Sequence, residues 1–133
     1  MPGPQDPVSI AHAIFLHVPA GVTDIRATLQ RRAAAAAARA LVRAGALSAK
    51  LPGANEILTR HGAKVTWVFG SLARRDASDT SDVDLAVEGL PPAAYFTVLA
   101  ELMLHFGVRV DLVRLEEAGA SLRACVLEEG RRL

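Results

Sequence analysis

Two aspartates, Asp82 and Asp84, stand two residues apart in an apolar run and are the first candidates for chemistry in this chain. The alternation of that run is typical of a strand, on which neighbouring side chains point to opposite faces. Val83, Leu85 and Val87 then share one face, and the two aspartates share the other. Paired carboxylates repel each other and lose hydration if they are buried without a counter-charge. No cationic residue adjoins them in the sequence, so the pattern predicts an oxygen-liganded divalent cation such as Mg²⁺.

A third aspartate, Asp111, lies in a second apolar run, residues 108–115, which is also predicted to form a strand. Alternation puts Arg109, Asp111 and Val113 on one face of it. A carboxylate in such a run is costly unless something compensates its charge. Two interpretations fit: an edge strand with one wet face, or a strand that pairs beside the first one and so gathers three carboxylates.

Gly70 and Ser71 come directly after a β-rich run at residues 65–69 and before a predicted helical turn at 72–75. Glycine lets the backbone approach a phosphate closely, and serine offers a hydroxyl and an N–H where a helical turn begins. By itself, a Gly-Ser pair after a strand is more often an ordinary turn. The polar segment 76–81 then predicts a loop that leads into the strand of the paired aspartates.

The order of these elements resembles the nucleotidyltransferase superfamily that includes DNA polymerase β. Its signature is a Gly-Ser, ten intervening residues and an Asp-x-Asp, which here are Gly70-Ser71, residues 72–81 and Asp82-Val83-Asp84. The surrounding sequence segments FGSLAR, SDVDLAVEG and VDLV are similar to those of minimal nucleotidyltransferases, called MNT domains. Many MNT domains are encoded beside a HEPN-domain toxin. The resemblance covers residues 55–133 and rests on the order and spacing of three separated elements.

The resemblance implies that three carboxylates form the catalytic and metal-binding set. Asp82 and Asp84 would hold the metal that grips the triphosphate of the donor nucleotide. Asp111 is the third metal-binding aspartate and would help hold a second Mg²⁺, which serves the acceptor hydroxyl. The reaction is then in-line nucleotidyl transfer, with pyrophosphate as the leaving group.

The resemblance also implies a nucleotide site and an acceptor. Gly70, Ser71 and Arg74 would bind the nucleotide, which for MNT domains is ATP. The acceptor would be a tyrosine of a HEPN-domain toxin, and the protein would act as its antitoxin by transferring AMP. Two alternatives stay open: a nucleotidyltransferase that acts on a small, antibiotic-type hydroxyl compound, and a binding-only antitoxin whose metal site is vestigial.

Arg75 departs from the family pattern, in which glycine usually follows the pair that is Ala73-Arg74 here. If this position requires a left-handed backbone, an arginine costs on the order of 1 kcal/mol. A second arginine near the triphosphate could equally help to bind it.

The expected fold is α/β (α+β), a small mixed sheet packed with helices in the polymerase-β-like manner, with an extra long helix at the N-terminus. Residues 1–22 are expected to be a lead-in and residues 23–133 the nucleotidyltransferase domain. The expected parts of that domain are a helix at 23–45, a break at 46–53, a catalytic core at 54–133 with helices at 54–61, 93–105 and 116–129, and a final extended edge at 131–133.

The long helix holds six consecutive alanines, Ala33 to Ala38, which permit close approach of another helix. Two interpretations stay open: it covers the sheet of its own domain, or it forms part of a subunit interface in a homo-oligomer.

Composition limits the binding partners and the cellular location that are expected for the protein. The net charge is +1 and no block of like charges occurs, so direct nucleic-acid binding is not expected. No stretch approaches the ~20 apolar residues of a membrane span. The single cysteine, Cys125, excludes an internal disulfide and fits a reducing compartment. The expected location is therefore cytoplasmic, without a membrane partner.

Overall fold

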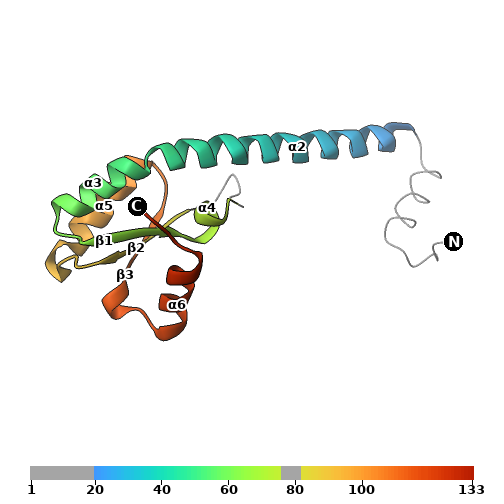
Figure 1. The fold of residues 1–133 in the computed structure, drawn as a ribbon. Coiled ribbons are helices and arrows are strands. Elements are labelled where there is room, and N and C mark those ends of the chain that lie inside the picture. Colours follow the sequence, from blue (N-terminus) through green and yellow to red (C-terminus); the bar gives the residue numbers. More distant parts are fainter. Residues whose placement is uncertain (1–19, 76–81) are drawn as a thin grey trace. The chain divides into compact units, whose positions relative to one another are not determined.

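The computed structural model describes residues 20–75 and 82–133, with side chains from residue 24 onward. The chain divides into two units, residues 1–36 and 37–133. Figure 1 labels most of the elements, and those after the first described helix belong to the second unit. In order, the described elements are α2 (Ala20–Ala49), α3 (Leu51–Arg60), β1 (Val65–Phe69), α4 (Gly70–Arg74), β2 (Val83–Glu88), the 3-10 turn η1 (Pro92–Ala94), α5 (Tyr95–Phe106), β3 (Val110–Arg114), the 3-10 turn η2 (Leu115–Glu117), α6 (Ala120–Glu129) and β4 (Arg131–Arg132).

The four strands form one mixed sheet in the order β3-β2-β1-β4. The strand β1 lies antiparallel to β2 and to β4, while β2 and β3 run parallel. The helix α5 makes the crossover between the parallel pair, as parallel strands require. The short strand β4 completes the edge beside β1, where an extended segment was predicted. The expected mixed α/β sheet with helices is confirmed.

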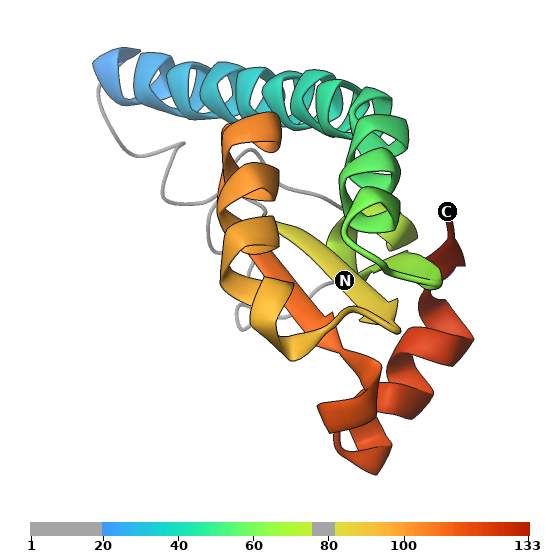
Figure 2. The ribbon, with the colours of Figure 1, turned by 90° about the vertical axis from the view of Figure 1, so that its left-hand side faces the viewer.

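Helices cover both faces of the sheet (Figures 1 and 2). The helices α3 and α5 lie on one face, and their buried side chains form the main core with those of the strands. The helix α6 lies on the other face, over a smaller cluster built around Phe69, Ala86, Leu115 and Val126. The alternation along β2 is as predicted, since Val83, Leu85 and Val87 all belong to the main core. The aspartates therefore share the α6 face.

Two predicted helix boundaries are wrong. The first helix was expected to close at Gly45 but continues to Ala49. A glycine inside a helix costs only about 1 kcal/mol relative to alanine, and continuation places Leu47 in the core, where it is 3% exposed. The expected break at 46–53 shrinks to Lys50, because Pro52 falls in the first turn of α3, where its missing N–H is not needed.

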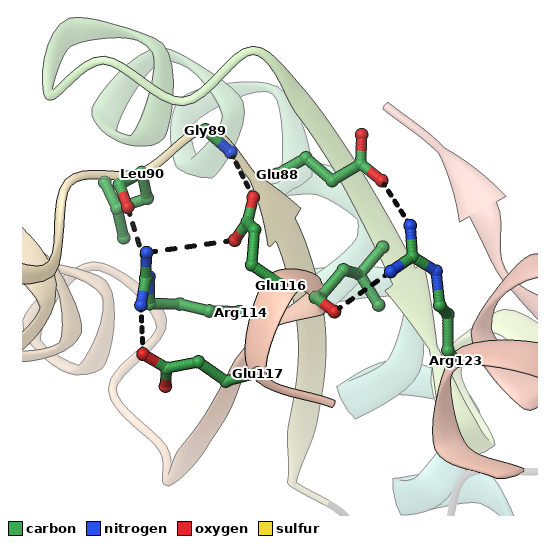
Figure 3. A network of polar contacts seen from close by, with 8 residues as sticks. Glu88, Gly89, Leu90, Arg114, Glu116, Glu117 and Arg123 are labelled. Atoms are coloured by element: carbon green, nitrogen blue, oxygen red, sulfur yellow. Dashed lines mark hydrogen bonds and ion pairs between the residues drawn. The ribbon is translucent and has the colours of Figure 1, made fainter. Parts of the chain in front are cut away.

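The helix expected at 116–129 is also divided. Residues 115–117 form η2, Ala118 and Gly119 are extended, and α6 begins only at Ala120. The carboxylate of Glu116 accepts a hydrogen bond from the Gly89 N–H at 2.7 Å (Figure 3). That contact ties the turn to the end of β2, which a helix continuing through residue 118 would not allow. The loop predicted at 76–81 lies outside the described residues.

No helix in the described part of the chain is long and apolar enough to cross a membrane.

Candidate active site

Asp82, Asp84 and Asp111 meet at one end of the parallel strand pair, and we call them the carboxylate cluster. In the register of β2 and β3, Asp84 lies directly opposite Asp111. Both interpretations of Asp111 hold: β3 pairs beside β2, which gathers the three carboxylates, and it is also an edge strand on which Asp111 is exposed. Asp82 comes just before β2, and the next N–H, that of Val83, donates to the carbonyl of Arg109 at 3.1 Å.

Asp84 has the most perturbed environment of the cluster. Partial burial, the negative charge of Asp111, a hydrogen bond with that same carboxyl group and the charge of Asp82 together raise the pKa of Asp84 to about 6. The guanidinium of Arg74 opposes this rise without cancelling it. Like charges that share a small volume favour the protonated form of one of them. At Asp84, burial and the two neighbouring carboxylates therefore outweigh the neighbouring guanidinium.

Gly70 is required by the cluster itself. Its φ is +69°, and a Cβ built there would overlap the Asp84 carboxylate and lie 3.0 Å from Asp84 Cγ. Any side chain at this position would push Asp84 out of place as well as strain the backbone. Gly70 was predicted for its approach to a phosphate. The structure adds a second reason, which is that β1 ends against the carboxylate of β2.

Arg109 places a positive charge beside two of the three aspartates, which no neighbour of Asp82 and Asp84 in the sequence indicates. Its Nε lies 3.8 Å from Asp82 Oδ2 and its Nη2 lies 3.8 Å from Asp111 Oδ1. The expectation that only a metal ion would counter these charges is therefore incomplete. Alternation had already put Arg109 and Asp111 on one face, but the contact with Asp82 depends on the parallel pairing of two strands, which the sequence does not give.

Arg74, predicted to bind the nucleotide, is the last residue of α4. Its Nη1 lies 3.3 Å from Glu129 Oε2 at the end of α6. Glu129 thus links the helix on the α6 face to the segment that follows Gly70 and Ser71. No feature of the sequence pointed to Glu129, because the pair joins residues that are far apart in the chain.

The next residue, Arg75, does adopt the left-handed conformation, with φ 62° and ψ 30°. Among the described residues it is the only non-glycine with positive φ. Its N–H donates to the carbonyl of Ser71 and closes α4. The backbone condition under which an arginine costs energy at this position is therefore met.

The donor set of the cluster fits a hard divalent cation, but the side chains do not converge on one. Three carboxylates are the ligands that Mg²⁺ prefers, and their mutual repulsion, seen at Asp84, would be relieved by a cation. In residues 20–75 and 82–133, however, no three carboxylate, imidazole or thiol groups are arranged to hold a metal ion as they stand. Binding would require side-chain rotation within the cluster.

Comparison with known proteins agrees with this geometry. The family model "Polymerase beta, Nucleotidyltransferase" matches residues 54–133. The chain is 38% identical over 77 residues to the protein adenylyltransferase MntA of Thermococcus cleftensis, an alignment that covers 56% of this chain and 78% of that protein. The chain belongs to the polymerase β nucleotidyltransferase family, and within it is a homologue of MntA.

Solved structures of related proteins share the fold. A structure described as a minimal nucleotidyltransferase is 33% identical, with TM-score 0.61, and the match covers 68% of this chain and 95% of that one. A toxin–antitoxin crystal structure with AMP-PNP is 26% identical, with TM-score 0.53, over 58% of this chain and 66% of that one. A complex of the MNT antitoxin with the tri-AMPylated HEPN toxin of Shewanella oneidensis, 22% identical, has TM-score 0.53 over 65% and 70% and shares the fold.

Proposed function

We propose that this nucleotidyltransferase transfers AMP from ATP to a hydroxyl of a HEPN-domain toxin, a tyrosine, and so acts as its antitoxin. The observation that carries the proposal is the pairing of Asp84 with Asp111 beside Gly70, in a chain 38% identical to a protein adenylyltransferase. A neighbouring structure that contains AMP-PNP and a fold neighbour bound to an AMPylated HEPN toxin support the donor and the acceptor.

The residues of the site would divide the work. Asp82, Asp84 and Asp111 would hold divalent ions, which would supply charge neutralisation of the triphosphate and activation of the acceptor hydroxyl. Gly70 leaves room for the Asp84 carboxylate beside β1 and would let the backbone approach the triphosphate closely. Arg74 contributes positive charge close to Asp84, and its contact with Glu129 limits where the guanidinium lies.

The test is incubation of the chain with α-labelled ATP, Mg²⁺ and the HEPN-domain protein of the same organism. The expected result is label on the toxin, located to a tyrosine by mass spectrometry, and loss of toxin activity. Two outcomes would contradict the assignment of the acceptor: label on a toxin variant in which that tyrosine is replaced by phenylalanine, or no label on the toxin at all.

A binding-only antitoxin is the second candidate, favoured by one observation. The carboxylates of the described site do not converge as they stand, and Arg109 contacts two of them. Under this alternative, Asp84→Asn neutralises the toxin as well as the wild type does. Under the enzymatic proposal, it forms the complex but leaves the toxin active.

A further inference from the structure

Arg109 holds a position that its sequence neighbours do not explain. The side chain is 73% exposed, yet its guanidinium makes both of its ion pairs with members of the carboxylate cluster. The two partners come from different segments, one just before β2 and one within β3. A guanidinium presents several donors in a fixed planar fork, which suits simultaneous contact with two carboxylates.

We propose that Arg109 is a built-in competitor of the divalent cation. Its guanidinium partly neutralises Asp82 and Asp111 in the metal-free protein, and its positive charge opposes the binding of a cation there. This inference rests on the metal site of the proposed function and adds a residue to which that function gives no role.

The atoms involved make the competition direct. Arg109 contacts Asp82 through Oδ2 and Asp111 through Oδ1. The positive charge of the guanidinium beside these two oxygens repels a cation that approaches them, and the described acidic side chains do not converge on a metal position as they stand. Both separations, at 3.8 Å, exceed hydrogen-bond length, and exposed ion pairs of this kind contribute little energy. Arg109 therefore lowers cation affinity without abolishing it.

The test is calorimetric titration of Mn²⁺ into the metal-free protein at low ionic strength, for wild type and Arg109→Gln. Removal of the competing charge should tighten Mn²⁺ binding by about three- to tenfold. The gain should shrink at high salt, because screening weakens the contribution of an exposed arginine. Arg109→Lys, which keeps the charge but not the fork, should fall between the two proteins.

Arg60→Gln is the matched control. It removes the same charge from a surface ion pair with Glu101, made between α3 and α5 at 2.8 Å, and should leave Mn²⁺ affinity unchanged. A second readout is thermal unfolding in EDTA, where Arg109→Gln should be less stable than wild type because the cluster loses its cation.

The outcomes separate the inference from the proposed function. Wild-type binding with unchanged or weaker binding by Arg109→Gln overturns the competitor role and leaves the metal site intact. Tighter binding by Arg109→Gln than by the wild type, with Arg60→Gln unchanged, supports the competitor role. Absence of Mn²⁺ binding by every variant overturns both.

Discussion

The two ends of the parallel pair β2–β3 use the same residue types to opposite effect. At the carboxyl end, Arg114 is 11% exposed and its guanidinium is surrounded by acceptors (Figure 3). Its Nε donates to the Leu90 carbonyl at 3.1 Å, Nη1 contacts Glu117, and Nη2 lies 3.9 Å from Glu116. The hydrogen bond from the Gly89 N–H holds the pKa of Glu116 below its ordinary range.

A second arginine closes the same network. Arg123 of α6 lies 3.5 Å from Glu88 Oε1, and its Nη1 donates to the Leu115 carbonyl at 3.5 Å. The carboxylates at this end therefore face guanidinium or N–H donors. These contacts hold η2 and α6 against β2, and they leave few charged groups at this end available to bind a ligand.

The amino end of the pair has the opposite balance. Three aspartates gather there, and the arginine that contacts two of them is largely exposed and at ion-pair distance only. The pKa of Asp84 is raised, whereas that of Glu116 is lowered. The carboxylates at one end are paired with guanidinium or N–H donors, whereas Asp84 at the other end is a carboxylate whose ionised form its surroundings disfavour. That contrast is the physical reason why we propose the binding site at the amino end.

The largest effect is expected from Asp111→Asn, which keeps the shape of the side chain but removes its charge. We expect nucleotidyl transfer to fall on the order of 100-fold or more, because charge that develops in the transition state loses its support. Binding of ATP·Mg²⁺ and of the partner should stay near normal, because Asp82 and Asp84 are intact. Transfer assays and equilibrium binding measure the two effects, and Glu117→Gln, at the other end of the strands, should leave the transfer rate unchanged. Transfer at the wild-type rate would mean that Asp111 is only a solvent-exposed residue of its strand and has no role in catalysis.

The reverse pattern is expected from Arg114→Ala. It leaves the Leu90 carbonyl and Glu117 without this donor and removes an ion-pair partner of Glu116, so the free energy of unfolding should drop by about 2 kcal/mol. Urea unfolding measures that change. The affinity for Mn²⁺ should not change, since the cluster lies at the opposite end of the strands. A loss of Mn²⁺ affinity without a loss of stability would break the comparison between the two ends.

A smaller effect on the free energy of unfolding is expected from Asp84→Asn. The substitution should stabilise the protein without a divalent cation and destabilise it relative to wild type when a cation is bound. The folded protein holds a proton on Asp84 up to a pKa of about 6, whereas the unfolded chain releases it near 3.8. Stability of the metal-free wild type should therefore fall as pH rises through this window. At pH 7 in EDTA the asparagine variant should be more stable by about 1 kcal/mol, a figure reduced for solvent screening of a partly open group.

Saturating Mn²⁺ supplies the internal control for that prediction. A cation that binds only the folded wild type stabilises it by mass action, so wild type should then become the more stable protein. Equal unfolding midpoints of the two proteins in EDTA at pH 7 would show that ionisation of Asp84 does not destabilise the folded protein.

The sequence predicted those parts of the site that depend on local pattern. Alternation along β2 assigned Asp84 to the face away from the main core, and the apolar run around Asp111 predicted its strand. The partners of these residues could not be predicted in the same way. The contact between Arg109 and Asp82 depends on the register of two strands, and the contact between Arg74 and Glu129 depends on where α6 packs.

Helix ends were the weakest part of the prediction for a related reason. Gly45 is a reasonable helix stop on propensity alone, but burial of Leu47 favours continuation. The interruption before α6 arises because Glu116 and Glu117 bond to groups on other segments. Tertiary contacts decided these boundaries, and a single sequence does not contain them.

The smallest expected effect concerns two left-handed helix caps, Arg75 after α4 and Gly107 after α5. Their backbones are almost the same, with φ values of 62° and 69°, and each N–H caps the preceding helix. A side chain at such a position costs about 1–2 kcal/mol, while glycine makes the unfolded chain more flexible and loses about 0.4–1 kcal/mol on folding. Arg75→Gly should therefore stabilise the protein by a net of about 0.5 kcal/mol.

Gly107→Ala is the mirror experiment. No atom lies within 4 Å of a Cβ built at Gly107, so only backbone strain is tested, and a loss of about 0.5–1 kcal/mol is expected. Chemical unfolding in EDTA measures both changes, and ATP titration of Arg75→Gly then decides what the arginine does. If Arg75→Gly is more stable but binds ATP more weakly, the arginine contributes to binding of the triphosphate in spite of its backbone strain. Unchanged ATP binding would mean that Arg75 is only a departure from glycine, and a loss of stability would contradict the strain argument itself.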